Sequence, residues 1–148
     1  MSICLIRIRG EVGLKSDVKE TLNRMRLRKK YSCVVIAHPK PEQLGMIKKI
    51  KDFVAFGKIN ESMFEKLIEK RGQLIDKKKK INAKEAAKEI EKGKTYEELN
   101  MKPFFRLHPP RGGIESKKHF GVNKGVLGNH EEKINELLER MLWRIINL

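Results

Sequence analysis

Residues 2–9 read SICLIRIR. Successive side chains of an extended chain point to opposite faces, so Cys4, Ile6 and Ile8 share one face of this stretch, while two arginines enter the other face near its end. The pattern predicts a half-buried β-strand, and the rest of the fold is worked out from it.

The residues that follow this strand predict a helix and then a second strand. Val18, Leu22 and Met25 step at four and three residues, which is the spacing of an amphipathic helix, and Ser16 precedes them as a candidate N-cap. The β-branched run inside residues 31–37 predicts the second strand.

A second helix and a third strand complete a β-α-β-α-β order over residues 1–59. Pro41 suits the first turn of a helix at 42–51, which we expect to bury Leu44, Ile47 and Ile50. Residues 53–59 predict the third strand. Such an order favours two helices on one face of a small sheet and leaves the other face available. The expected core of this unit is Ile6, Ile8, Leu22, Met25, Val35 and Ile47.

From residue 60 the pattern changes to short capped helices, which we assign to a helical insertion over residues 60–102. Asn60, Asn82 and Thr95 are each predicted to cap a helix. Between the first two helices runs Lys77–Lys80, which is too polar to be packed, and we interpret it as a solvated loop in preference to a specific contact.

Residues 103–128 contain three of the five prolines and five of the eleven glycines, together with several basic and aromatic side chains. Such a segment has few buried anchors, so it is predicted to be an extended basic loop. Residues 129–148 follow as a C-terminal amphipathic helix with one apolar stripe, expected to pack on the body of the protein. The predicted fold class is α+β.

The charge of the chain points to a polyanionic partner. Of 148 residues, 34 are Lys or Arg and 19 are Asp or Glu, for a net charge of +15. The excess is +8 over residues 1–57, +4 over 58–102 and +3 over 103–148, so it is not a detachable tail. A wide basic surface favours nucleic acid.

Several other classes of protein lack support in the sequence. Cys4 and Cys33 sit in separate apolar runs and are predicted to be buried reduced thiols. We find no signal peptide, no apolar run of membrane length, no phosphate cradle and no metal-ligand spacing, so we expect an intracellular soluble protein without a cofactor or a metal.

The residues expected to contact RNA fall in two stretches, the C-terminal end of the first helix and the extended loop. Prolines stiffen the loop, glycines let it lie flat, and arginines supply planar forks that grip phosphate or stack on bases. The candidate RNA-binding residues are Arg24, Arg26, Arg28, Lys29, Lys30, Arg106, His108, Arg111, Gly112, Gly113, Lys117, Lys118, His119 and Lys124. We expect the loop to become ordered on RNA.

Two motifs also resemble a known family. The sequence RLHPPRGG at 106–113, with GNH at 128–130 and the helix that follows, resembles the long archaeal and eukaryotic form of large-subunit ribosomal protein L-thirty. The first 59 residues resemble the short bacterial form, through the strand ending in Arg7, Gly13, the stretch at 27–29 and the stretch at 45–49. Residues 72–100 match only loosely.

The resemblance implies a ferredoxin-like core and a structural role in the large ribosomal subunit of the cytoplasm. It implies contact with large-subunit rRNA, a position near 5S rRNA, and ribosomal proteins as neighbours. Carried over by residue, it places Arg106, His108, Arg111, Gly112 and Gly113 in an RNA-facing loop, and Arg28 and Lys29 where the core meets RNA.

Two other classes of function are alternatives to a structural RNA-binding role. An RNA-processing or RNA-cleaving enzyme would use His108 and His119 as an acid and base pair, but flexible flanks give no rigid scaffold to hold two rings in place. A scaffold for other proteins would use the last helix, whose stripe is equally that of an ordinary core helix.

Overall fold

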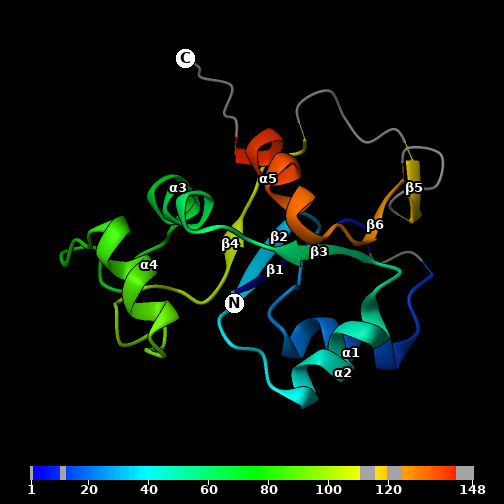
Figure 1. Ribbon diagram of the computed structural model, residues 1–148. Coiled ribbons are helices and arrows are strands. Elements are labelled where there is room, and N and C mark those ends of the chain that lie inside the picture. Colours follow the sequence, from blue (N-terminus) through cyan, green and yellow to red (C-terminus); the bar gives the residue numbers. More distant parts are fainter. Residues whose placement is uncertain (1, 11–12, 111–115, 120–124, 143–148) are drawn as a thin grey trace.

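The computed structural model describes residues 2–10, 13–110, 116–119 and 125–142 (Figure 1). Its elements are β1 Ile3–Arg7, α1 Ser16–Arg24, β2 Ser32–Ile36, α2 Pro41–Ile50, β3 Val54–Lys58, α3 Glu61–Arg71, α4 Ala83–Glu91, β4 Phe105–Arg106, β5 Ser116–His119, β6 Gly125–Asn129, the 3-10 turn η1 Glu131–Lys133, and α5 Ile134–Leu142. The predicted α+β class and the order β1-α1-β2-α2-β3 are confirmed.

The described strands form a six-stranded sheet in the order β4-β2-β1-β3-β6-β5. β1 is antiparallel to both of its neighbours, with Ile6 opposite Cys33 of β2 and Ala55 of β3. β4 adds to β2 in antiparallel fashion, and β6 adds to β3 in parallel. The chain therefore leaves β1 and returns along both of its edges.

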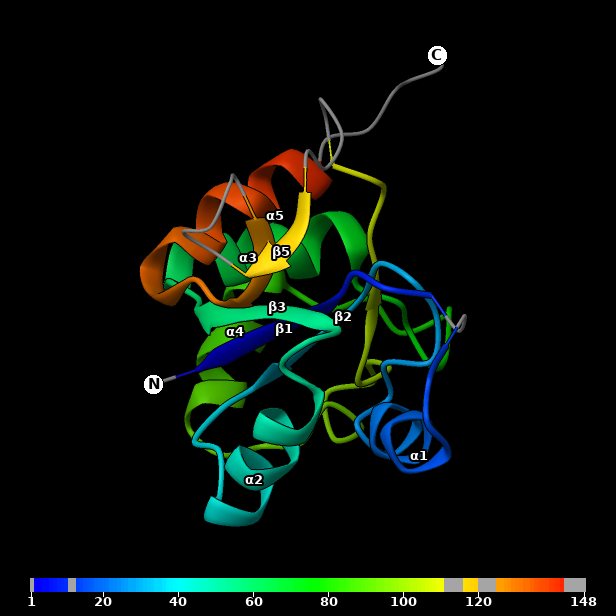
Figure 2. The same cartoon turned by 90° about the vertical axis from the view of Figure 1, so that its right-hand side faces the viewer.

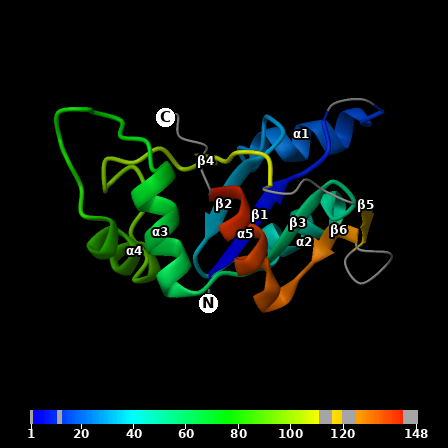
Figure 3. The same ribbon diagram turned by 90° about the horizontal axis from the view of Figure 1, so that it is seen from above.

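Helices cover both faces of the sheet. α1 and α2 lie on one face, and α3 and α5 lie on the other with α4 beside α3 (Figures 1 and 2). From above, α5 lies over the strands (Figure 3). Two predictions are therefore wrong. β1 is not half-buried, since Cys4, Leu5 and Ile6 are all inaccessible, and the second face of the sheet is not left available. Helices from later in the chain supply the missing layer.

The predicted core residues are all buried, but they belong to two clusters. Ile6, Ile8 and Val35 pack under α3 and α5, whereas Leu22, Met25 and Ile47 pack between the sheet and the first two helices. The prediction for Leu44 is wrong, because its side chain is 42% exposed. It lies in α2, where Ile47 and Ile50 already fill the face toward the sheet.

The helix caps were predicted with mixed success. Asn60 caps α3 by accepting a hydrogen bond from the Met63 amide at 2.8 Å, and Asn82 caps α4 in the same way, so both predictions are confirmed. Ser16 is the first helical residue and not the cap. Thr95 accepts the amide of the third residue after it at 3.3 Å, but the residues that follow form turns and not a helix.

The segment 103–128 differs from the predicted extended loop. Its described parts contribute β4, β5 and all of β6 except Asn129 to the sheet. Phe105 is fully buried and packs edge-on against Tyr96, with ring centroids 6.1 Å apart. The composition of the segment did not reveal buried residues such as Phe105, because two or three apolar residues are enough for a short edge strand.

The last helix packs as predicted. α5 buries Ile134, Leu137, Leu138, Met141 and Leu142 against α3 and β3, while residues 143–148 of the predicted helix lie outside the described residues. The stripe is therefore part of the core, which removes its use as a scaffold surface. Across the described ranges, no helix is long and apolar enough to cross a membrane.

Cys4 and Cys33 are buried free thiols, as predicted, but they also lie together. Their sulfur atoms are 3.4 Å apart across β1 and β2. Burial, followed by the hydrogen bond with Cys4, raises the pKa of the Cys33 thiol well above its usual range. Cys33 is therefore a protonated thiol, and the two side chains pack as part of the core.

Candidate nucleic-acid interface

The basic residues predicted at the end of the first helix lie in a turn between α1 and β2. The turn closes α1 through a hydrogen bond from the Leu27 amide to the Leu22 carbonyl at 2.8 Å, and Arg26 adopts a left-handed conformation with φ +64°. Leu27 is fully buried, whereas the three residues after it, Arg28, Lys29 and Lys30, are exposed. One apolar anchor thus fixes a turn whose other side chains face water.

Arg7 supports this turn from inside the protein. Its side chain is 1% exposed, and it donates hydrogen bonds from Nε to the Arg9 carbonyl and from Nη1 to the Leu27 carbonyl, both at 2.9 Å. Its own carbonyl accepts the Tyr31 amide at 2.7 Å. Arg7 was not among the predicted site residues. An arginine inside an otherwise apolar strand was the signal that pointed to such a role.

Arg106 lies beside the same turn. It pairs with Ser32 across β4 and β2, and the Leu107 amide donates to the Tyr31 carbonyl at 3.0 Å. The buried Phe105 holds the strand in place, and Arg106 is exposed. The structure thus brings together the two stretches that the sequence marked separately.

Four strand ends meet at this place: β1 and β4 finish here, while β2 and β3 start here. We call the exposed cations around them the basic end of the sheet, made up of Arg9, Arg28, Lys29, Lys30 and Arg106. Arg9 was not predicted. It is the second residue after β1, and its amide donates to the Phe53 carbonyl at 3.2 Å.

Aromatic rings lie under several of these cations. The Lys30 Nζ lies 5.2 Å from the centroid of the Tyr31 ring, and the Arg106 guanidinium carbon lies 5.8 Å from that of Phe104. The Arg9 guanidinium carbon lies 5.9 Å from the centroid of the ring of Phe53, the residue before β3. An exposed cation–π contact is worth about 0.5–1 kcal/mol, enough to bias a side chain toward one position. RNA recognition uses such arginine and aromatic planes for stacking and such cations for phosphate.

Arg24 and Arg26 are exposed but hold acidic partners. Arg24 lies 2.7 Å from Glu20 and Arg26 lies 3.9 Å from Glu97. Both arginines line an open groove of about 450 Å³ between α1, β2 and the turn at 93–97. Surface ion pairs contribute little to stability, so a phosphate can replace either carboxylate at small cost.

The remaining predicted residues are described only in part. His108 is half-buried, and its amide donates to the Met141 carbonyl at 3.2 Å, which ties the end of β4 to α5. Residues 117–119, which include Lys117, Lys118 and His119, lie in β5, whose backbone pairs with β6 in parallel. Arg111, Gly112, Gly113 and Lys124 lie outside the described residues.

Ionisable groups with a shifted pKa lie elsewhere. Burial raises the pKa of Tyr96 well above its usual range, and the Lys94 ammonium lowers the pKa of the half-exposed Glu89 by a hydrogen bond and then by its charge. With Cys33, these are core groups and one surface pair, and none is a predicted RNA-binding residue. Within the described part of the chain, no group of three or more His, Cys, Asp or Glu is arranged to hold a metal ion.

The fold and this surface define an α+β protein that gathers basic and aromatic side chains at one end of its sheet. Comparison with known proteins agrees. Residues 3–54 match the family model described as Ribosomal protein L30p/L7e. The chain is 42% identical to large ribosomal subunit protein uL30 of Desulfurococcus amylolyticus, over 93% of this chain and 96% of the relative.

Two further relatives carry the same description. The uL30 protein of Archaeoglobus fulgidus is 40% identical over 93% of this chain and 97% of its own length, and that of Methanococcus maripaludis is 36% identical over 96% and 100%. The chain belongs to the L30p/L7e family of ribosomal proteins. Members of this family are structural components of the ribosome and not enzymes, so the hypothesis of an RNA-cleaving histidine pair is abandoned.

Proposed function

We propose that this chain is a structural protein of the large ribosomal subunit, located on cytoplasmic ribosomes, and that it binds rRNA through the basic end of its sheet. The observation that carries the proposal is the pairing of β4 with β2, which sets Arg106 beside the turn that holds Arg28, Lys29 and Lys30. The relatives named above, all large-subunit proteins, and the net charge of +15 support it. Ribosomal proteins that border this site in the subunit are its other partners.

The chemistry of this surface suits a structured RNA. Exposed ammonium groups neutralise phosphates without regard to sequence, while the guanidinium of Arg106 above Phe104 offers a plane on which a base can stack. The turn is held by the buried Arg7 and Leu27, so it loses little conformational entropy on docking. We infer that this end of the protein provides affinity and a fixed orientation.

Binding of the purified chain to large-subunit rRNA over a range of salt concentrations tests the proposal. Affinity should fall log-linearly with salt, and Arg28→Ala combined with Arg106→Ala should reduce the magnitude of the slope by about 1.4–1.8, because each lost phosphate contact removes about 0.7–0.9. Lys84→Ala combined with Lys88→Ala removes the same charge from α4 and is the matched control. A flat salt dependence of the parent, or equal losses in both double variants, would reject this interface.

The loop motif belongs to the same proposed interface. Arg111 is proposed to position the protein at its rRNA site. The other residues of this segment that we assign to the contact are His108, Gly112, Gly113, Lys117, Lys118, His119 and Lys124. Arg111→Ala should weaken site-specific binding without loss of stability, and Arg111→Lys should restore it only in part, since lysine lacks the planar fork. Binding by Arg111→Lys equal to that of the parent would exclude a role for the fork.

We also propose that the protein lies close to 5S rRNA, on the basis of its family resemblance. Because Cys4 and Cys33 are buried, a thiol introduced by Lys30→Cys is the one that an iron chelate would label. Hydroxyl-radical cleavage of 5S rRNA in reconstituted subunits supports the position. Cleavage confined to the large rRNA argues against it.

A further inference from the structure

The lysine run at 77–80 sits in a turn that is closed by one asparagine. The Asn100 side chain accepts a hydrogen bond from the Asp76 amide at 2.8 Å, and it donates to the carbonyls of Asp76 at 2.9 Å and Lys79 at 3.0 Å. The Asn100 carbonyl accepts the Ile75 amide at 3.0 Å. One side-chain amide thus bonds to both ends of the turn.

The turn closed by Asn100 is attached to the core of the protein. Asn100 has φ +60°, a left-handed conformation that asparagine adopts more readily than most residues. The next residue, Met101, is fully buried and forms a β-bridge with Leu74, and the Lys102 amide donates to the Gln73 carbonyl at 2.9 Å. The lysine side chains are therefore exposed, as the prediction of a solvated loop requires, while the backbone of the turn is fixed to the core.

This arrangement holds four like charges together. All four side chains of Lys77–Lys80 are exposed, and none forms an ion pair with a described residue. The adjacent carboxylate of Asp76 is used within the turn, where it accepts the Lys78 amide at 3.0 Å. Neighbouring ammonium groups repel one another, so a free loop would spread them apart. The hydrogen bonds of the turn instead keep the four residues on one short stretch of fixed backbone, where a partner of opposite charge can contact them together.

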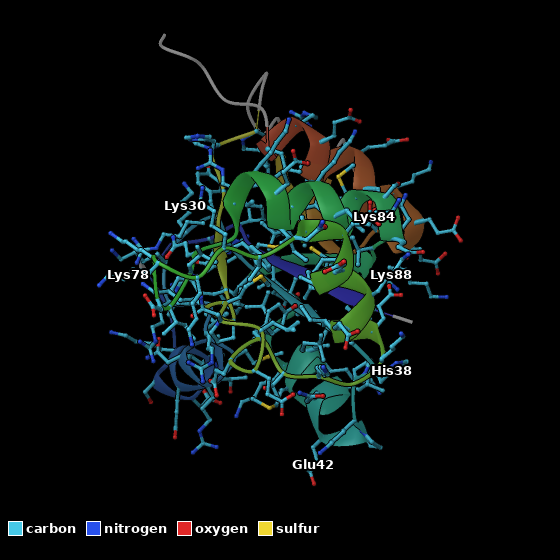
Figure 4. All side chains as sticks on the ribbon, turned by 90° about the vertical axis from the view of Figure 1, so that its left-hand side faces the viewer. Lys30, His38, Glu42, Lys78, Lys84 and Lys88 are labelled. Carbon is cyan, nitrogen blue, oxygen red and sulfur yellow. The ribbon has the colours of Figure 1, made fainter. Side chains whose placement is uncertain are left out.

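The turn also faces the same side of the molecule as the basic end of the sheet. Figure 4 shows Lys30 and Lys78 projecting from one side, whereas Lys84 and Lys88 project from the opposite side. In the view from above, the segment between α3 and α4 and the segment that follows α1 lie along the same edge (Figure 3). An extended polyanion can therefore reach both.

We propose that Lys77–Lys80 form a second, separate contact with the sugar-phosphate backbone of the rRNA, with Asn100 as the residue that positions them. The inference rests on the proposed function. Lysine offers a compact charge without the planar fork of arginine, so the contact reads phosphate and not base identity. It assigns a role to the part of the chain, residues 72–100, that matches the family resemblance only loosely.

The test measures binding of the full chain to large-subunit rRNA at several salt concentrations. Lys78→Ala combined with Lys79→Ala should lower the magnitude of the salt slope by about 1.4–1.8, whereas the control, Lys84→Ala combined with Lys88→Ala, should leave it close to that of the parent. Asn100→Gly keeps the left-handed backbone and removes the side-chain bonds. It should weaken binding about 5–10-fold with little change of slope, because all four charges remain while their order is lost.

A double-mutant cycle separates positioning from general stability. If Asn100 acts through the lysines, Asn100→Gly should have little effect on affinity in the background of Lys78→Ala and Lys79→Ala. An equal loss in both backgrounds overturns the positioning role. If the variant with Lys78→Ala and Lys79→Ala binds rRNA with the affinity and salt slope of the parent, the proposed rRNA contact is wrong. If that variant also fails to assemble into subunits, an acidic protein neighbour is the partner of the lysines instead. Failure of the parent to bind rRNA removes the proposed function together with this inference.

Discussion

Replacing Gly57 by alanine tests the close approach of β3 to the start of the last helix. A Cβ at this position would collide with the carbonyl oxygen of Glu131 and lie 2.9 Å from Ile134 Cβ. A backbone oxygen cannot swing aside as a flexible side chain does, so η1 must move away from β3. Overpacking costs about 1–3 kcal/mol, and the lower entropy of the unfolded alanine chain offsets up to about 1 kcal/mol.

We therefore expect Gly57→Ala to lose about 2 kcal/mol of unfolding free energy. In a chain of this size, that lowers the midpoint of thermal unfolding by about 4–8 °C. Gly45→Ala is the matched control, because a Cβ on Gly45 in the exposed face of α2 meets nothing within 4 Å. Alanine in a helix is favoured over glycine by about 0.8–1 kcal/mol, so this variant should unfold a few degrees above the parent.

Thermal and urea unfolding followed by far-ultraviolet circular dichroism would measure all three proteins. A Gly57→Ala variant that unfolds with the parent would show that η1 does not pack on β3 as described. A comparable loss in Gly45→Ala would show that the methyl group alone, and not the contact, causes the effect.

Three further predictions follow from buried and paired side chains. Leu22→Ala should lower the unfolding free energy in urea by about 2–5 kcal/mol, since this side chain is fully buried, whereas Leu44→Ala should cost less than about 1 kcal/mol because that side chain is 42% exposed. Tyr96→Phe removes the hydroxyl that donates to the Val35 carbonyl at 2.7 Å and should cost about 1–2 kcal/mol. Burial raises the pKa of Tyr96 in the folded state, so Tyr96 contributes to the free energy of unfolding below its unfolded pKa of about 10, and this contribution declines as the pH rises above that value. In urea unfolding at alkaline pH, the free energy of unfolding should therefore decline less in Tyr96→Phe than in the parent. In filter binding to large-subunit rRNA, Arg106→Lys should recover only part of the affinity lost in Arg106→Ala, and full recovery would mean that charge alone matters there.

Local patterns in the sequence were sufficient for the order of the first five elements and for two caps. Alternation and helical spacing reflect which side of each element avoids water, and they identified Leu22, Ile47 and Val35 as core. Asn60 and Asn82 were predictable because a cap satisfies amides only two or three residues away. The cap predicted at Thr95 failed, since the same local bond also starts a turn.

The candidate site was predictable by residue type and not by position. The clusters around residue 28 and residue 106 were both marked as basic, yet nothing local says that β4 pairs with β2. Arg7 was placed on an open face because the alternation counts only its neighbours along the chain. The lysine run was interpreted as a solvated loop and is exposed, but nothing local indicated that its backbone is held by Asn100, which comes about twenty residues later.

The sequence by itself determined the order of the secondary-structure elements in residues 1–59, the basic character of the protein and the residue types of its proposed RNA-binding surface. Only the tertiary structure decided that a second layer of helices covers the other face of the sheet and that Cys4 and Cys33 are in contact. It also decided that Arg9 and Arg106 lie at the same end of the sheet. The physical reason is range. Periodicity and capping depend on residues within one or two turns of one another, whereas burial of a sheet face depends on which distant segment gains most by covering it.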